Sequence, residues 1–157
     1  MSDKYFYVMS KEKMKIRILE KERIDEIKPL WEGLNSLHTQ LSPHFKQYYQ
    51  NLSFTKRTEK LIKKKQLKIF VASESDSIIG YCIASAKADF GKINSLFVLP
   101  EFRNKAIGHE LMETALKWLQ KQKCIYVDLI VIEGNEKVIP FYEKYGFKKR
   151  VTIMRKA

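Results

Sequence analysis

Hydrophobic and polar residues follow two different periods along this chain, and each period predicts one type of element. A two-residue period favours strands, whereas apolar residues three and four positions apart favour helices. Strand patterns cover residues 14–19, 66–73, 77–87, 92–99, 124–132 and 147–154. Helical patterns cover residues 21–41, 55–65, 104–121 and 135–145, and the segment 44–51 is ambiguous.

Local signals sharpen several of these boundaries. The helical stretch 21–41 is either one amphipathic helix or two helices with a break near Gly33. It ends at Ser42, because the residue before a proline avoids helical geometry. Gly146 is the expected stop of the last helix. The strand 124–132 is mostly apolar, which indicates burial on both of its faces.

The order of these elements predicts a mixed α/β fold. Antiparallel strands come first, and one strand–helix–strand crossover follows. This order places helices on both faces of a mostly antiparallel central sheet. A length of 157 residues fits one domain, which we expect at residues 14–157, with residues 1–13 as an N-terminal tail.

The chain is strongly basic, with a formal net charge of +12. Such a charge favours an anionic partner such as nucleic acid, an acidic membrane or a phosphorylated cofactor, but it is also typical of a soluble protein from a lysine-rich proteome. The densest cationic cluster, residues 56–68, lacks interleaved aromatic residues and indicates the solvated face of a helix. We therefore expect no specific nucleic-acid partner.

Two cysteines, Cys82 and Cys124, sit in apolar segments without a CxxC partner. This pattern is typical of reduced core thiols in the cytosol and predicts no metal site. The N-terminus lacks a signal-peptide pattern, and no apolar run approaches the ~20 residues of a membrane span. The sequence therefore predicts a cytoplasmic protein with no membrane partner.

Candidate chemistry begins at a turn of small and basic residues, Arg103–Gly108, between a strand and a long helix. The first N–H groups of a helix have no internal partner, and the helix dipole gives that end a partial positive charge. A turn of small residues lets the backbone approach a pyrophosphate, and Arg103 and Lys105 add charged donors. The alternative is an ordinary strand–helix loop.

A second segment, Asn135–Phe147, follows the strand at 124–132. Its pattern Asn-x-x-Val-x-x-Phe-Tyr-Glu-Lys-x-Gly-Phe, together with Arg-x-x-Ala-x-Gly at the earlier turn, resembles the two signature motifs of the GNAT superfamily of N-acetyltransferases. The resemblance extends over about residues 14–155, and the predicted element order agrees with that fold. Both motifs occur in the order and at the spacing typical of the family.

The resemblance implies acetyl-CoA as cosubstrate, held in a cleft between two splayed strands. The strand at Ile93–Val98 would carry a bulge and separate from the strand at Ile125–Val131, and a bulge frees backbone groups from the ladder. The pantetheine arm would lie along Leu96, Phe97 and Val98, with hydrogen bonds to the backbone of Leu96 and Val98. The Val98 N–H would stabilise the oxyanion, and such a donor is worth ~3 kcal/mol.

The same resemblance assigns the remaining cofactor contacts. The pyrophosphate would meet the N–H groups of Arg103, Asn104, Lys105, Ala106, Ile107, Gly108 and His109. Asn135 would contact the amide arm, and Tyr142 would be the general acid for the departing thiolate. Other interpretations stay open: Asn135 as a helix N-cap, Tyr142 as a core aromatic residue, and Arg103 as a surface residue.

Two departures from the family pattern concern the chemistry directly. Ala106 stands where the family has a glycine, and its methyl group narrows the phosphate approach if the backbone needs a positive φ. Lys92 and Asn94 stand where many relatives place a basic carboxylate. The proton of the amine would then pass to water, or the amine would arrive uncharged. Further candidates for the base are Glu133, Asp89, His38 and His44.

The segment Leu37–Phe54 is where the family tends to bind its acceptor, and here it holds aromatic residues and no carboxylate. Those aromatic residues either line the acceptor cleft or pack the helices on the sheet. The sequence thus predicts direct acetyl transfer to a primary amine of a small molecule or peptide, neutral or anionic rather than polycationic. The alternatives are a catalytically weak CoA-binding sensor and, with less support, a nucleic-acid-binding domain. A homodimer is also anticipated.

Overall fold

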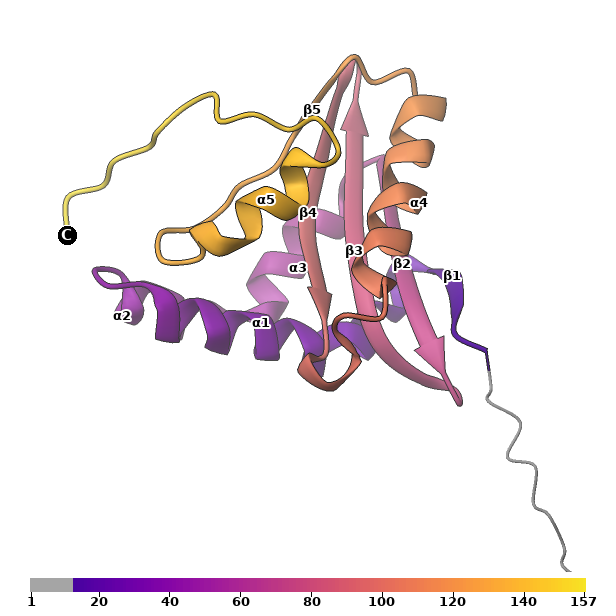
Figure 1. Cartoon of the computed structure of the whole chain (residues 1–157), viewed down its shortest axis with the longest axis horizontal. Helices are drawn as coiled ribbons and strands as arrows, with labels where there is room; N and C mark the ends of the chain where they lie inside the picture. Colours follow the sequence, from indigo (N-terminus) through magenta and orange to yellow (C-terminus); the bar gives the residue numbers. More distant parts are fainter. Residues whose placement is uncertain (1–12) are drawn as a thin grey trace, which may run out of the picture.

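The computed structural model of the chain describes residues 13–157, so the expected N-terminal tail lies outside the described residues except for Lys13 (Figure 1). Five strands form one sheet in the order β1-β2-β3-β4-β5. β1 to β4 pair antiparallel, and β4 pairs with β5 in parallel. The strands are β1 (Lys15–Leu19), β2 (Gln66–Glu74), β3 (Ser77–Lys87), β4 (Phe90–Val98) and β5 (Tyr126–Asp128).

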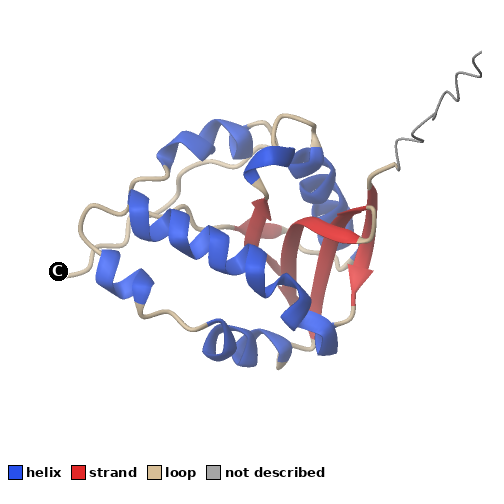
Figure 2. Cartoon of the chain, turned by 90° about the horizontal axis from the view of Figure 1, so that it is seen from below, coloured by secondary structure: helices blue, strands red, loops and turns tan. Residues whose placement is uncertain are grey.

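Helices lie on both sides of this sheet, as the sequence predicts (Figure 2). One side carries the 3-10 helix η1 and the helices α1 and α3, and the other side carries α4. The elements are η1 (Lys21–Ile27), α1 (Lys28–Leu41), α2 (Lys46–Gln50), α3 (Phe54–Ile62), η2 (Pro100–Phe102), α4 (Ile107–Lys121), η3 (Glu136–Val138) and α5 (Ile139–Glu143).

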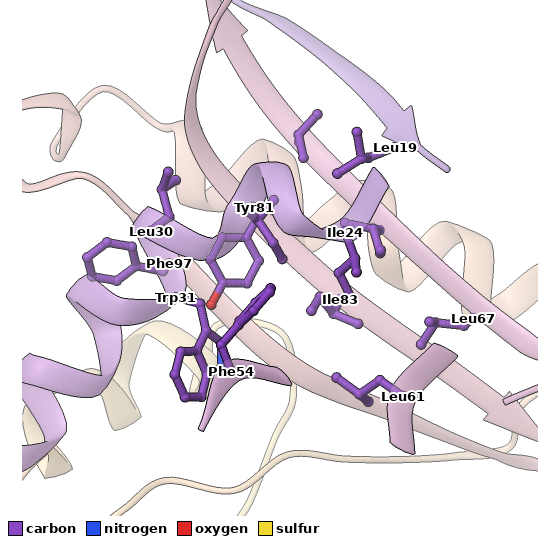
Figure 3. Packing of buried hydrophobic residues seen from close by; sticks show 13 residues of the cluster. Leu19, Ile24, Leu30, Trp31, Phe54, Leu61, Leu67, Tyr81, Ile83 and Phe97 are labelled. Atoms are coloured by element: carbon purple, nitrogen blue, oxygen red, sulfur yellow. The ribbon is translucent and has the colours of Figure 1, made fainter. Parts of the chain in front are cut away.

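The core on the α1 side is built from aromatic and branched side chains (Figure 3). Trp31 of α1 meets Phe54 of α3 edge to face, with ring centroids 5.5 Å apart. The Tyr81 ring is fully buried, and its hydroxyl lies 2.8 Å from Ser95 Oγ, which satisfies the one polar atom it brings into the core. This core fixes α1 across the sheet.

Of the two alternatives for the first helical stretch, the structure has two elements, η1 and α1, and the expected break near Gly33 is wrong. The non-helical backbone lies inside η1 at Arg23, with φ −102° and ψ 16°, and α1 begins at Lys28 with Pro29 in its first turn. Gly33 lies inside α1 and serves close packing, since a Cβ there would be 3.3 Å from the Phe97 ring. Gly33 therefore allows α1 to approach β4.

The core on the α4 side contains the apolar stripe that the sequence predicts for this helix. Its fully buried members are Leu111, Met112, Ala115 and Leu119. They pack in one cluster with Cys82 of β3 and Ile93 of β4. Phe141 and Tyr142 of α5 pack against the margin of the same cluster, so α5 lies on the α4 side of the sheet. This packing brings the two signature segments together.

β4 has the irregularity that the family resemblance implies. The register against β3 pairs Ser95 with Ile83 and Ile93 with Ala84, so Asn94 is the extra, bulged residue. Pairing with β5 is restricted to Phe90–Lys92 of β4. Beyond Lys92 the two strands separate, and the predicted splay of these strands is confirmed.

Two predicted strands differ from the structure. The stretch 124–132 forms a strand only at Tyr126–Asp128, and one of its faces is exposed rather than buried, since Tyr126 and Ile130 are open to solvent. The expected last strand at 147–154 is not formed, and residues 147–157 contain neither helix nor strand. Alternating apolar residues express a tendency to form a strand, but a strand also needs a neighbour with free backbone groups.

Candidate active site

The candidate site is centred on the last residue of β4. The Leu99 N–H donates to the Ile79 carbonyl at 2.9 Å, so it faces β3. Backbone groups of successive strand residues face opposite edges, and those of Val98 therefore face away from β3. Arg103 Nε donates to the Val98 carbonyl at 3.0 Å from that outer side, in agreement with this orientation. The Val98 N–H thus faces the edge from which β5 has separated.

The turn after β4 presents the unpaired N–H groups of a helix start. The first bond of α4 runs from the Glu110 N–H to the Ala106 carbonyl at 3.0 Å. The N–H groups of Ile107, Gly108 and His109 precede it and have no intrahelical acceptor. Ala106 caps the helix without a side-chain hydrogen bond and has a φ of 62°. Ala106 therefore has the positive φ at which its methyl group narrows the approach of the phosphate.

Gly108 is the point where β4, α4 and α5 meet. A Cβ at this position would lie 3.7 Å from the Phe141 ring and 3.9 Å from Val98 Cγ2, which is ordinary contact distance. The end of β4, the first turn of α4 and the signature helix α5 therefore surround one point. The structure thus brings together the two motifs, whose first residues, Arg103 and Asn135, are 32 positions apart in the sequence.

α5 is tied to the start of α4 by a polar and aromatic contact. His109 Nδ1 lies 2.6 Å from the Tyr145 hydroxyl, and the His109 ring lies 4.8 Å from that of Phe141. Tyr142 is on the same short helix and packs edge to face with Phe141 and Phe147. Burial raises the pKa of Tyr142 to about 12, so its phenol is protonated at neutral pH.

Asn135 is a buried amide with an unsatisfied oxygen. The residue is 8% exposed, and its Oδ1 has no hydrogen-bond partner among residues 13–157. It does not cap η3, because no side-chain bond is made to that helix. An unpaired buried acceptor costs ~1–3 kcal/mol, and native structures retain few of them. This oxygen is suited to receive an N–H group from a ligand.

Glu133, two positions before Asn135, joins this loop by hydrogen bonds to the residues that follow α1. Glu133 Oε1 accepts from Ser42 Oγ at 2.5 Å and from the His44 N–H at 3.0 Å, while Oε2 lies 3.0 Å from His44 Nδ1. The hydrogen bonds from Ser42 and His44 lower the pKa of Glu133 to about 2. Glu133 is thus charged and already engaged, so it is a very weak base.

The backbone of this loop also lies directly against the end of α1. A Cβ at Gly134 would lie 2.0 Å from the Leu41 carbonyl oxygen. Only a glycine permits this approach, and the φ of 83° there also favours glycine. The loop that carries Asn135 is therefore pressed against the segment expected to bind the acceptor. From the sequence, Glu133 is predicted only as a candidate base. No local pattern indicates its contacts with Ser42 and His44, about ninety positions away.

Other predicted residues are less closely associated with the site. Phe97 points to the opposite side of the sheet, where it is buried in the core beside Gly33. Asp89 lies in the β3–β4 turn, nine strand residues and ~30 Å from Val98. Arg103 and Lys105 are exposed, and their charged groups lie over the Phe97 and Phe102 rings, respectively. Asn104 is exposed and, like Ala106, has a positive φ.

The residues in place of the usual strand carboxylate are both half-buried. Asn94 Nδ2 donates to Ser85 Oγ at 2.8 Å, which holds the bulged residue against β3. Lys92 lies in the short β4–β5 ladder. Neither side chain can act as a base in its ordinary charge state.

A sequence model of the acetyltransferase (GNAT) family matches residues 31–147. The chain therefore belongs to this family, and it is an N-acetyltransferase that uses acetyl-CoA as its acetyl donor. The family predicted from the two motifs is confirmed.

Individual relatives and structures agree with this assignment. An acetyltransferase of Yersinia enterocolitica is 26% identical over 90% of this chain and 92% of its own. The solved structure of a putative acetyl transferase from Pyrococcus furiosus is 26% identical, with a TM-score of 0.72 over 92% of this chain and 99% of that one. The aminoglycoside N-acetyltransferase AAC(6')-Iy in complex with CoA has the same fold, with 21% identity and a TM-score of 0.68 over 95% and 98% of the two chains.

Two further features are absent from the described part of the chain. Residues 13–157 contain no group of three or more histidine, cysteine, aspartate or glutamate side chains arranged to hold a metal ion. In the same range, no helix combines the length and the apolar character needed to cross a membrane.

Proposed function

We propose that this enzyme transfers the acetyl group directly from acetyl-CoA to a primary amine of a small-molecule or peptide acceptor, with both substrates bound at once. The observation that carries the proposal is the free edge of β4 at Val98, in contact through Gly108 with the unpaired first turn of α4. A backbone edge suits an amide-bearing arm, and a helix start suits a diphosphate.

In this arrangement, each group of the cosubstrate has a complementary group on the chain. The N–H groups of Ile107, Gly108 and His109 would hold the diphosphate, with Arg103 and Lys105 near the turn as cations. The backbone of Leu96 and Val98 and the free Oδ1 of Asn135 would hold the pantetheine amides. This use of Asn135 explains an unsatisfied polar atom that the fold alone leaves unexplained.

The reaction would proceed by attack of the amine nitrogen on the thioester carbonyl carbon. The C–N bond forms, the C–S bond breaks, and the electron pair leaves with sulfur as CoA thiolate. The Val98 N–H would stabilise the charge that develops on the carbonyl oxygen. Tyr142 would donate its phenolic proton towards the leaving sulfur. With a pKa of about 12, its contribution comes mainly from donating a hydrogen bond as the C–S bond breaks.

The state of the cysteines supports direct transfer rather than an acetylated enzyme. Burial raises the pKa of the Cys82 thiol to about 12, and the pKa of Cys124 is also raised by burial. The thiolate is the nucleophilic form, so neither cysteine is activated at neutral pH. The proton of the amine would pass to water or to His38, whose pKa is lowered by burial. Glu133 and His44 engage each other, and Asp89 is remote.

The acceptor is proposed to be a neutral or anionic amine. The solved relatives of this fold include aminoglycoside acetyltransferases, one in complex with sisomicin, and aminoglycosides are polycations. This chain has a net charge of +12, and residues 37–54 contain no carboxylate. Repulsion would disfavour a polycation there. A cytoplasmic location and a homodimeric state also stay predictions.

A thiol-release screen tests the proposal with acetyl-CoA and a panel of amines. The panel should contain anionic amino compounds, peptides with free N-termini, polyamines and aminoglycosides. We expect release with members of the first two groups and a large loss of kcat in Tyr142→Phe. Tyr126→Phe is the matched control, because Tyr126 is exposed on β5 and should keep full turnover.

The same screen separates the enzyme from a CoA-binding sensor. Calorimetric binding of CoA with no thiol release from any amine would favour the sensor. Full turnover in Tyr142→Phe would remove Tyr142 from the mechanism, and release only with polycations would contradict the proposed acceptor class.

A further inference from the structure

The half of α1 that follows Gly33 is only partly covered by the sheet. The apolar face of this helix begins with Leu30 and Trp31, which are buried in the core. The next residues on the same face, at spacings of three and four, are half-buried: Leu34, Leu37, His38 and Leu41. Figure 1 shows α1 continuing past the end of β4 towards α2. His38 is therefore a polar side chain on the inner face of α1, where that face leaves the core.

Two close contacts of α1 lie on either side of His38. The first is at Gly33, which packs against the Phe97 ring at the end of β4. The second is at Leu41, whose carbonyl group meets the loop at Gly134. The eight residues between these contacts span about 12 Å, at 1.5 Å per residue. His38 thus lies between the strand end that would stabilise the oxyanion and the loop that would hold the pantetheine arm.

The His38 imidazole is packed on one side and free at both nitrogens. Its ring lies edge-on to that of Tyr49 in α2, with centroids 5.8 Å apart. Neither ring nitrogen has a hydrogen-bond partner among residues 13–157, and the buried side-chain atoms without a partner in this range are Ser73 Oγ and Asn135 Oδ1 alone. The nitrogens of His38 are therefore open to solvent and can receive a group from a ligand.

The other two histidines of the chain are already engaged. His44 Nδ1 lies 3.0 Å from a carboxylate oxygen of Glu133. His109 Nδ1 lies 2.6 Å from the Tyr145 hydroxyl, at the start of α4 where the diphosphate would bind. His38 is thus the histidine within residues 13–157 that combines partial burial with two unbonded nitrogens.

The surroundings of His38 favour its uncharged form. Burial lowers its pKa below the ordinary value of about 6.5, so at neutral pH the imidazole can accept a proton. Tyr49 is the titratable group in contact with the ring, and Tyr48, Glu133 and Arg155 lie close enough to act on the pKa of Tyr49. Glu133 and Arg155 carry opposite charges and offset each other, so burial has the larger effect.

We propose that His38 is the general base of this enzyme and takes a proton from the ammonium group of the acceptor. This inference rests on the proposed function, in which both substrates are bound at once. The proton passes from the ammonium nitrogen to the imidazole, and the lone pair that it leaves attacks the thioester carbon. The second proton lost as the amide forms balances the one that the thiolate takes up, and the imidazolium returns its proton to water.

The experiment compares two acceptors in the thiol-release assay over a range of pH. One is the best alkylamine of the screen, which is protonated at neutral pH, and the other is its analogue with fluorine atoms β to the nitrogen, which is largely uncharged. With the alkylamine at pH 7, His38→Gln should lower kcat/KM about 100-fold. It should also abolish the fall in kcat/KM that the unaltered enzyme shows as His38 becomes protonated below pH 6.5. With the fluorinated amine, the same variant should lose only a few-fold.

Two further variants separate proton transfer from packing. His38→Phe keeps a ring against Tyr49 but has no nitrogen, so with the alkylamine it should be as slow as His38→Gln. Ser36→Gln is the control on the exposed face of α1 and should keep both rates. Calorimetry should give the same affinity for CoA in all three variants, because none of these side chains belongs to the proposed CoA site.

Several results would overturn the assignment of His38. Equal losses with the two amines would show that His38 binds the acceptor or docks α2 without moving a proton. Normal turnover in His38→Phe would leave it a packing role alone, and a larger loss in His44→Gln would assign the base to His44. If the unaltered enzyme releases thiol and His38→Gln matches it, only the base is wrong. If the unaltered enzyme releases no thiol with any amine, the proposed function fails and the base with it.

Discussion

The Tyr145 hydroxyl lies 2.6 Å from Nδ1 of His109, and this contact holds α5 against the first turn of α4. The two helices supply different parts of the proposed site, one the diphosphate donors and the other Tyr142. Burial raises the pKa of Tyr145, so its phenol is protonated at neutral pH, and the hydroxyl donates to the His109 carbonyl oxygen at 3.4 Å.

Tyr145→Phe should therefore remove one half-buried hydrogen bond while keeping the ring. We expect a loss of about 1 kcal/mol in the free energy of unfolding and a several-fold weaker affinity for CoA. Denaturant unfolding and calorimetry measure the two quantities. Tyr48→Phe, at an exposed tyrosine of α2, should change neither. An unchanged CoA affinity in Tyr145→Phe would show that the contact is purely structural.

Ala106→Gly tests the left-handed residue at the start of α4. A non-glycine residue in this conformation costs ~1–2 kcal/mol. Glycine removes this cost, but part of the gain is offset because glycine makes the unfolded chain more flexible. We expect a net gain of about 0.5–1 kcal/mol in stability and CoA binding at least as tight as in the unaltered enzyme. Ala88→Gly is the matched control, since Ala88 has a φ of 53° in the distant β3–β4 turn and should gain stability alone. A clear loss of CoA affinity in Ala106→Gly would reject the prediction.

Asn135→Ala should change stability and affinity in opposite directions. The substitution removes a buried oxygen that has no partner within the described chain, so the free protein should be as stable as before or more stable. Loss of one ligand hydrogen bond should weaken CoA binding about tenfold. Asn35→Ala provides the contrast: Asn35 Nδ2 donates to the Tyr49 carbonyl at 2.8 Å, and its loss should destabilise the protein without affecting CoA. Unchanged CoA binding in Asn135→Ala would show that Asn135 Oδ1 does not bind CoA.

Glu133 should make the stability of the protein sensitive to acid. Its pKa is lowered to about 2 by hydrogen bonds from Ser42 and His44, whereas an unfolded glutamate titrates near 4.3. The stabilisation is therefore fully present above the unfolded value and is lost as the pH falls towards 2. Glu133→Gln should melt at a lower temperature at pH 7 and show a flatter pH dependence below pH 4.5. The exposed Glu59→Gln in α3 is the control, and an identical acid profile for both variants would contradict the assignment.

Much of the fold could be predicted from periodicity, because α4 and β2 to β4 have regular apolar patterns that packing does not override. A break near Gly33, one of the two alternatives for the first helical stretch, does not occur, since glycine is compatible with a helix when it serves a close contact with Phe97. Pro29 gives the better signal, as the first turn of a helix accepts proline. The last strand could not be predicted correctly, because its formation depends on an available edge and not on local sequence.

The site was partly accessible from the sequence. The two motifs identify the family and locate the turn at Arg103–Gly108, but the positive φ of Ala106 is a property of the folded turn. The link between Glu133 and Ser42 joins residues ninety-one positions apart. No local pattern reveals such a contact, and only the docking of the loop at Gly134 on Leu41 explains it.

The short β4–β5 ladder also bears on how such a protein tolerates change over evolution. Because the opening between the strands arises from main-chain geometry, the groups that face it belong to every amino acid except proline. Substitutions along β4 can therefore alter the side chains that line the opening between β4 and β5, while the backbone N–H and C=O groups stay in place. Under the proposed binding mode, a lineage can thus adopt a new acceptor without rebuilding its hold on the acetyl donor.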